Sequence, residues 1–348
     1  MRESTGHDPA LPASGIENDA PEIASGQPAA PSWRSRLMHY GRYVFIAAVV
    51  VAMATFLWRQ RQDVHDALVS LPPGSVALSL LLALIGAGLP GLVWRDLVTA
   101  QGYRTRPLAG LRVFFLAQLG KYLPGGIWNY VAQVDMARDL RVPPRQSALA
   151  SLLSLALSVI TALITAGLTL PFALPGLLAA YWWTFLAIPV LVALLVPRCV
   201  TWWSSLAFRL LRRPAEPVRL TGATLLRASL LMMASWLALG LHLLLLVRGT
   251  GGDIASLPLL SIGGFALAWV AGFLVLFAPA GAGVREAALV LCFAGVLPGG
   301  VVLTIALLSR VLLVVADGLL ALGLLLGARV AARRRPVPVP STGPDGAA

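Results

Sequence analysis

The chain has 348 residues, of which 58% are hydrophobic and 12% are charged, and its mean hydropathy is +0.80. Soluble globular domains carry about 25% charged residues, so this composition excludes an ordinary soluble protein. The net charge is +12, which in a soluble protein could indicate nucleic-acid binding. Here the arginines cluster between long apolar runs, as in membrane proteins whose basic loops face the cytoplasm, so we expect no nucleic-acid binding. The continuous apolar runs predict an all-α, polytopic transmembrane helical bundle.

The chain begins with a segment that has no apolar face to bury. Residues 1–40 are rich in proline, alanine, glycine and serine, which predicts a disordered tail. Arg34, Arg36 and Arg42 lie at or next to its end, directly before the first apolar run. This arrangement predicts that the N-terminus faces the cytoplasm.

The membrane domain is expected over residues 41–328. Hydropathy predicts about six full spans and two re-entrant hairpins, which together would look like seven or eight transmembrane segments. An arrangement of eight full spans fits the hydropathy equally well. We expect the full spans at about 43–58, 75–94, 148–170, 177–196, 228–247 and 301–326, and the hairpins within 108–134 and 257–297. Residues 329–348 read as a second disordered cytoplasmic tail, since arginines and prolines dominate them.

Two breaks in apolar sequence organise this domain. The first contains Pro124, Gly125 and Gly126, directly after Lys121, the only lysine in the chain. The second contains Pro279, Gly281 and Gly283. Unpaired backbone amides are costly in hydrocarbon, so a broken helix must be shielded by protein or line a wet cavity. We therefore predict that both breaks are hairpin tips that meet near the middle of the membrane.

The order of the segments suggests inverted repeats. The second span, first hairpin and third span would run in the opposite direction to the fifth span, second hairpin and sixth span. Corresponding breaks in two inverted halves are the best sequence pointer to a transport site. Chance is the alternative, because glycine and proline are common in membrane helices.

Charged residues close to the breaks are candidates for binding. Lys121, Tyr122 and Arg285 are predicted to contact an anionic lipid headgroup, because cations at membrane depth are costly and are usually retained for pairing or function. For Lys121 the alternative is a side chain that extends to the membrane surface.

Three further charged residues complete a predicted buried cluster with Lys121 and Arg285: Glu286, Arg310 and Asp317. We expect Arg310 to reach Glu286 and Asp317 to reach Arg285, or the reverse. With three positive and two negative charges, full pairing leaves one cation for a lipid headgroup. The alternative is a set of static ion pairs that only locks the helices together.

At the two breaks the chain resembles a known family. The residues Lys121 to Gly125 with Trp128, and Pro279 to Gly283 followed by Val284, Arg285 and Glu286, are similar to motifs of the lysylphosphatidylglycerol synthase transmembrane region, a flippase-like family. Ala280 stands where that family usually has glycine. The resemblance covers about residues 40–330 and implies lipid handling, without the soluble synthase domain of the bifunctional relatives.

These observations lead to one functional hypothesis and two alternatives. We expect a protein of the cytoplasmic membrane, with both termini inside, that binds and translocates an anionic phospholipid or glycolipid. The first alternative is a membrane-embedded transferase or an accessory subunit that works with a lipid-synthesis protein, and the second is a scaffold for partner membrane proteins. Because the chain carries none of the common catalytic or metal-binding motifs, we expect no enzyme activity, metal or cofactor. His242 stands alone in an apolar helix, and we expect it to be a hydrogen-bonded core residue.

The arginine distribution predicts that the loop from Arg198 to Arg227 faces the cytoplasm, whereas the loop around Asp253 faces outside. In a variant with Cys199 and Cys292 replaced by serine, a single cysteine at Glu216 should react with an impermeant maleimide only after the cells are opened. A single cysteine at Asp253 should react in intact cells. Labelling of the Glu216 position from outside would contradict the topology.

Overall fold

The computed structural model describes residues 71–123, 127–174, 176, 185–210, 220–250, 254–275 and 281–333, and also residues 47, 51, 55, 58, 59 and 69. Nearly all of the predicted first span and the first half of the predicted fourth span, 177–184, lie outside this part of the chain. So do both termini and the predicted hairpin tips at Pro124, Gly125, Gly126 and Pro279.

All regular structure in the described ranges is helical, which confirms the predicted all-α bundle. The long helices are α3 (Pro73–Ala100), α6 (Pro144–Ala173), α10 (Gly222–Gly249), α11 (Leu257–Leu274) and α13 (Gly299–Arg333). The short ones are α4 (Pro107–Gln118), η1 (Leu119–Tyr122), α5 (Trp128–Ala137), η2 (Arg138–Leu140), α8 (Ala187–Leu194), α9 (Pro197–Leu210) and α12 (Val284–Cys292).

Within the described residues, five helices are long and apolar enough to cross a membrane, namely α3, α6, α10, α11 and α13. A sixth is reached if α8 and α9, which are bent by 78° at the break between them, count as one span. The inclusion of α11 fits the eight-span alternative, in which this segment is a full span rather than a hairpin arm. Its 18 residues correspond to about 27 Å at the usual helical rise, almost the thickness of the hydrocarbon core.

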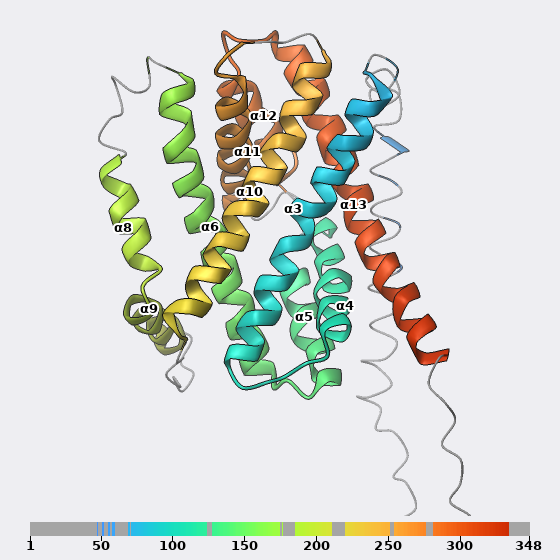
Figure 1. Cartoon of the computed structure of the whole chain (residues 1–348), viewed down its shortest axis with the longest axis vertical. Coiled ribbons are helices and arrows are strands. Elements are labelled where there is room, and N and C mark those ends of the chain that lie inside the picture. Colours follow the sequence, from blue (N-terminus) through green and yellow to red (C-terminus); the bar gives the residue numbers. More distant parts are fainter. Residues whose placement is uncertain are drawn as a thin grey trace, which may run out of the picture. The chain divides into compact units, whose positions relative to one another are not determined.

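The two hairpins lie toward opposite ends of the bundle. In Figure 1, α4 and α5 lie side by side in the lower half of the view, whereas α11 and α12 lie in the upper half. The chain therefore enters the bundle from one end in the first hairpin and from the other end in the second. This is the arrangement that inverted repeats require.

Helix packing follows the same inverted symmetry. One repeat consists of α3, α4, α5 and α6, and the other of α10, α11, α12 and α13. Each neighbouring pair in one repeat has a counterpart in the other, and α3 packs against α10 at the centre. The hairpins cross over: α4 packs against α13 of the other repeat, and α11 packs against α6. Each hairpin is thus held partly by the opposite repeat.

Two glycines mark equivalent close approaches in the two repeats. Gly91 in α3 and Gly240 in α10 occupy the same position, counted from the first residues of their helices. A Cβ atom on Gly91 would lie 2.9 Å from the ring of Phe115 in α4, and one on Gly240 would lie 2.4 Å from Cα of Ile262 in α11. In both repeats a glycine lets the first helix approach the first arm of its hairpin.

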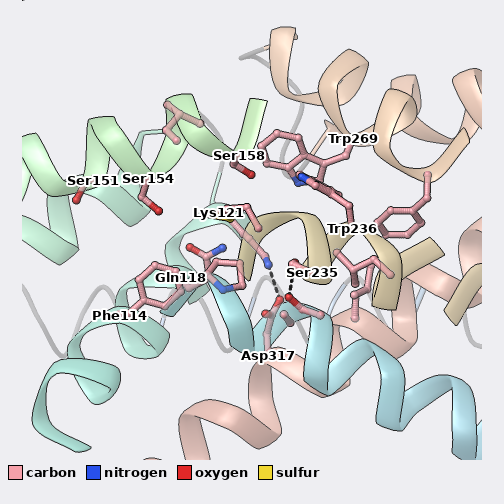
Figure 2. Close-up of a pocket in the computed structure, with 18 of the residues that line it drawn as sticks. Phe114, Gln118, Lys121, Ser151, Ser154, Ser158, Ser235, Trp236, Trp269 and Asp317 are labelled. Carbon is pink, nitrogen blue, oxygen red and sulfur yellow. Dashed lines mark hydrogen bonds and ion pairs between the residues drawn. The ribbon is translucent and has the colours of Figure 1, made fainter. Parts of the chain in front are cut away.

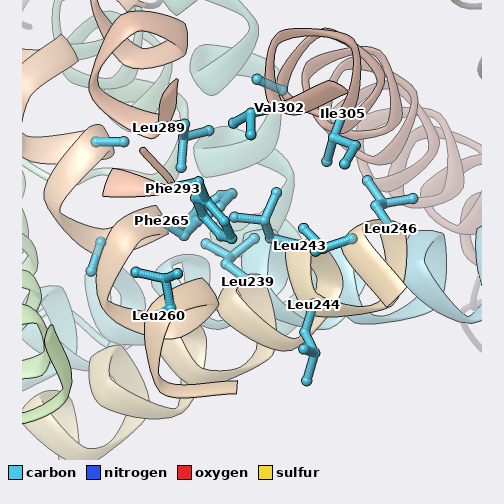
Figure 3. Close-up of a cluster of buried hydrophobic side chains, with 14 of the residues drawn as sticks. Leu239, Leu243, Leu244, Leu246, Leu260, Phe265, Leu289, Phe293, Val302 and Ile305 are labelled. Carbon is cyan, nitrogen blue, oxygen red and sulfur yellow. The ribbon is translucent and has the colours of Figure 1, made fainter. Parts of the chain in front are cut away.

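The apolar core forms two clusters, one around each hairpin. Figure 3 shows part of the cluster around the second hairpin, where Leu239 and Leu243 of α10, Phe265 of α11 and Phe293 after α12 pack together. The other cluster contains Trp94, Phe114 and Phe115 at the first hairpin. The two hairpins are therefore packed as parts of the protein interior rather than as surface loops.

A buried imidazole connects the central helices, as the sequence suggested. His242 of α10 is fully buried, with Nδ1 2.7 Å from the hydroxyl of Ser79 in α3 and Nε2 2.8 Å from the hydroxyl of Ser309 in α13. Both ring nitrogens have partners, so this histidine serves as a hydrogen-bonded junction of three helices.

The close approach at Gly240 predicts a specific sensitivity to size. Gly240→Ala should lower the free energy of unfolding by about 1–3 kcal/mol, because the new methyl group would collide with backbone of α11. Gly88→Ala is the matched control: it adds the same methyl group to α3, where nothing lies within 4 Å, and should not destabilise. Thermal unfolding of the two variants in detergent measures the difference. Equal melting temperatures would contradict the packing described here.

Candidate functional site

A cavity of about 140 Å³ lies between the two repeats and receives side chains from both hairpins. Figure 2 shows Lys121 and Asp317 at its centre, serines of α6 along one side, and Trp236 and Trp269 on another. The charged and phenolic groups that line it are Lys121, Tyr122, Tyr130, Arg285, Arg310 and Asp317. The residues that flank the two breaks therefore meet in one place, although Pro124, Gly125, Gly126 and Pro279 of the predicted tips lie outside the described residues.

Asp317 of α13 is bound from the first hairpin. Its Oδ2 lies 2.6 Å from Nζ of Lys121 and accepts a hydrogen bond of 2.5 Å from the hydroxyl of Tyr122. The expectation that Asp317 would pair with Arg285 was therefore wrong. The physical reason is the crossed packing of the repeats, which brings α4 and η1 against α13.

Arg310 of α13 pairs with Glu286 of α12, as the sequence suggested. Nη1 of Arg310 lies 2.6 Å from Oε1 of Glu286, and their side chains are only 10% and 6% exposed. The second oxygen, Oε2, accepts a 2.6 Å hydrogen bond from the backbone N–H of Gly283, which begins α12. One carboxylate thus neutralises a buried arginine and also caps the helix.

The start of α12 depends on glycines of the second break. Gly281 has φ +70° and Gly283 has φ +84°, both in the region that favours glycine. A Cβ atom on Gly281 would lie 2.8 Å from Cα of Gly272 near the end of α11. The two glycines therefore turn the chain tightly against α11 and direct the following residues, Arg285 and Glu286, into the bundle.

Among the described residues of this cavity, Arg285 is the cation that forms no ion pair with an acid. Its Cζ lies 4.2 Å from the ring centroid of Phe265, and its buried Nη2 has no hydrogen-bond partner among the described residues. The two acids of the cluster are already bound to Lys121 and Arg310. The spare positive charge expected from the sequence thus resides on Arg285.

The sequence interpretation missed a polar stripe on α6. Ser147, Ser151, Ser154, Ser158, Thr161 and Thr165 recur every three or four residues, and Ser151, Ser154 and Ser158 line the cavity. That spacing on an otherwise apolar helix was a usable signal, because it places small polar groups on one face. Trp236 and Trp269, which lie inside predicted apolar segments, offered no comparable signal.

Two apolar grooves adjoin the cavity. One lies between α12 and α13 and includes Val290, Leu303 and Leu307, and it shares Arg310 with the cavity. The other lies between α5 and α6 and includes Val131, Val134 and Leu152, and it shares Tyr130 and Ser151. Each has a volume of about 600 Å³. They lie between equivalent helix pairs of the two inverted repeats.

Comparison with protein families gives a match over most of the chain. The family model described as the lysylphosphatidylglycerol synthase TM region matches residues 44–321. The chain belongs to this family. The matched region contains both breaks and every charged residue of the cavity. Membership and the apolar helices together identify a multi-pass membrane protein with a lipid-related role. No curated protein matches the chain.

The buried ion pair at α12 leads to a stability prediction. Glu286→Gln should lower the free energy of unfolding by about 3–5 kcal/mol, because it leaves the charge of Arg310 without its partner at low exposure. The double variant Glu286→Gln with Arg310→Met should regain much of this loss, since neither charge is then buried alone. Chemical unfolding in detergent measures both. A double variant as unstable as the single one would contradict the pairing.

Proposed function

We propose that the protein binds an anionic phospholipid or glycolipid by its headgroup and translocates it across the cytoplasmic membrane. The observation that carries the proposal is Arg285, which lines the central cavity and whose buried Nη2 makes no hydrogen bond with other described residues. A cation in such surroundings is stabilised by an anion, and guanidinium matches phosphate well because it can donate two parallel hydrogen bonds.

The remaining charges support an anion in this cavity rather than a cation. Arg285 lies within electrostatic reach of Arg310, Glu286 and Asp317, but both carboxylates are bound elsewhere. With Lys121 included, this cluster holds three positive and two negative side chains, so a singly charged phosphodiester would bring the sum of its charges to zero. Lys121, at 30% exposure the most accessible of the paired residues, is a second group that can face the phosphate, as the sequence suggested.

The two grooves support movement of the lipid as well as binding. The cavity, at about 140 Å³, suits a headgroup and not the acyl chains, which are better accommodated on apolar surface. The groove at α12 and α13 and the groove at α5 and α6 each share lining residues with the cavity and belong to opposite repeats. In inverted-repeat transporters the halves rock about a central site, which exposes it alternately to the two sides.

The test is lipid translocation in vesicles. The purified full chain is reconstituted with phosphatidylglycerol that carries a fluorophore on one acyl chain, and the rate at which inner-leaflet lipid becomes accessible to an impermeant quencher is measured. Arg285→Gln should slow this rate at least about tenfold, the effect of losing one charged hydrogen bond. It should not lower the melting temperature, because it removes an unpaired buried charge.

Two controls make the result specific. Arg248→Gln removes an exposed arginine of α10 that does not line the cavity, and it should translocate at the wild-type rate. Lipid recovered after the assay should be chemically unchanged. A modified headgroup would instead favour the transferase alternative, and wild-type rates for Arg285→Gln would contradict the proposed site.

A further inference from the structure

One side of the cavity, formed by α6 and the end of α4, carries hydrogen-bonding groups that no described residue engages. Ser151 is occupied, because its hydroxyl lies 2.5 Å from Oε1 of Gln133 and accepts a bond from Trp94. By contrast, the side chains of Ser154, Ser158 and Gln118 line the cavity and make no hydrogen bond with other described residues. Figure 2 shows all three directed toward the space around Lys121.

The α10 and α11 side of the cavity is aromatic. Trp236 and Trp269 both line it and meet edge to face, with ring centroids 5.0 Å apart. The indole N–H of Trp236 donates to Thr161, and Phe273 stacks on Trp269 at 5.6 Å. These contacts fix both rings, so that the cavity has a rigid apolar wall opposite a row of neutral hydroxyl and amide groups.

This combination suits a particular kind of chemical group. Glycerol and sugars carry several hydroxyls that exchange hydrogen bonds with serine and glutamine side chains, and their C–H surfaces pack on aromatic rings. Among the described residues that line the cavity, an ammonium group finds no free carboxylate, because the two carboxylates of the cluster already bind Lys121 and Arg310. It would also be repelled by Arg285, which forms no ion pair among the described residues.

We propose that the cavity selects a lipid phosphate that bears a neutral polyhydroxyl group, a glycerol or a sugar, and discriminates against headgroups that carry an ammonium group. This inference rests on the proposed function. Arg285 binds the phosphate, while Ser154, Ser158 and Gln118 bind the hydroxyls and Trp269 packs on the carbon skeleton. The chemistry is shared by phosphatidylglycerol and by hexosyl phosphates of polyprenols.

The first experiment measures binding of defined lipids to the full chain in detergent by native mass spectrometry. Five lipids are compared: phosphatidylglycerol, a polyprenyl hexosyl phosphate, phosphatidic acid, phosphatidylethanolamine and lysylphosphatidylglycerol. At least one of the first two should bind about tenfold more tightly than either ammonium-bearing lipid, and tighter than phosphatidic acid, which lacks the polyol. Comparison of the two polyol lipids identifies which source the cavity prefers.

The second experiment uses variants that separate the polyol from the phosphate. The double variant Ser154→Ala with Ser158→Ala should remove most of the preference for the polyol lipids over phosphatidic acid, while leaving phosphatidic acid binding unchanged. Arg285→Gln should weaken all phosphate lipids alike. Ser229→Ala is the matched control, since it removes a buried serine of α10 that does not line the cavity, and it should behave as wild type.

The outcomes distinguish this inference from the proposed function. If lysylphosphatidylglycerol binds as tightly as the polyol lipids, or if the serine double variant keeps their preference, the polyol assignment is wrong. If the protein translocates lipids with all headgroups at one rate in vesicles, the proposed transport is supported and the proposed headgroup selectivity is wrong. If no lipid binds and none moves, the proposed function itself fails.

Discussion

Charge at membrane depth is the constraint on which the rest of this structure depends. An isolated charged side chain at the centre of a bilayer is unfavourable by about 2.5–3.5 kcal/mol on insertion scales, and by more on others. The protein brings Lys121 to Asp317 and Arg310 to Glu286, with oxygen–nitrogen distances of 2.6 Å in both pairs. These contacts require both hairpins and α13 to converge, so the pairing of charge fixes how the broken segments lie.

The second constraint is that backbone N–H and C=O groups at a broken helix must find hydrogen-bond partners. The protein meets this constraint and the pairing of buried charges with the same side chain. A helix that ends inside the membrane leaves amides and carbonyls unpaired. At the second break Glu286 binds the N–H of Gly283 and the guanidinium of Arg310 at once. The same carboxylate that neutralises a cation therefore satisfies a broken helix, and the positive φ angles of Gly281 and Gly283 make that geometry accessible.

Much of this arrangement could be predicted from the sequence. Hydropathy and the two Pro/Gly breaks predicted the helical bundle and the opposed hairpins, and charge counting predicted that one cation would lack an acid. Hydropathy left open whether α11 is a hairpin arm or a full span, because an apolar segment of 18 residues fits either. The partner of Asp317 could not be deduced either, since the crossing of α4 onto α13 depends on contacts between distant segments. Nor could composition indicate that Trp236 and Trp269 face a cavity rather than lipid.

The crossed hairpins have a consequence for how the protein is made. The hydrogen bond from Tyr122 to Asp317 joins residues separated by 195 positions. At a synthesis rate of about 5–20 residues per second, the first hairpin exists for roughly 10–40 s before the ribosome has produced its counter-ion. During that interval Lys121 must remain near the membrane surface or bind a lipid phosphate or an insertion factor. Final burial of the first hairpin therefore has to wait for the last helix, and release of the chain before α13 would leave the lysine without its acid.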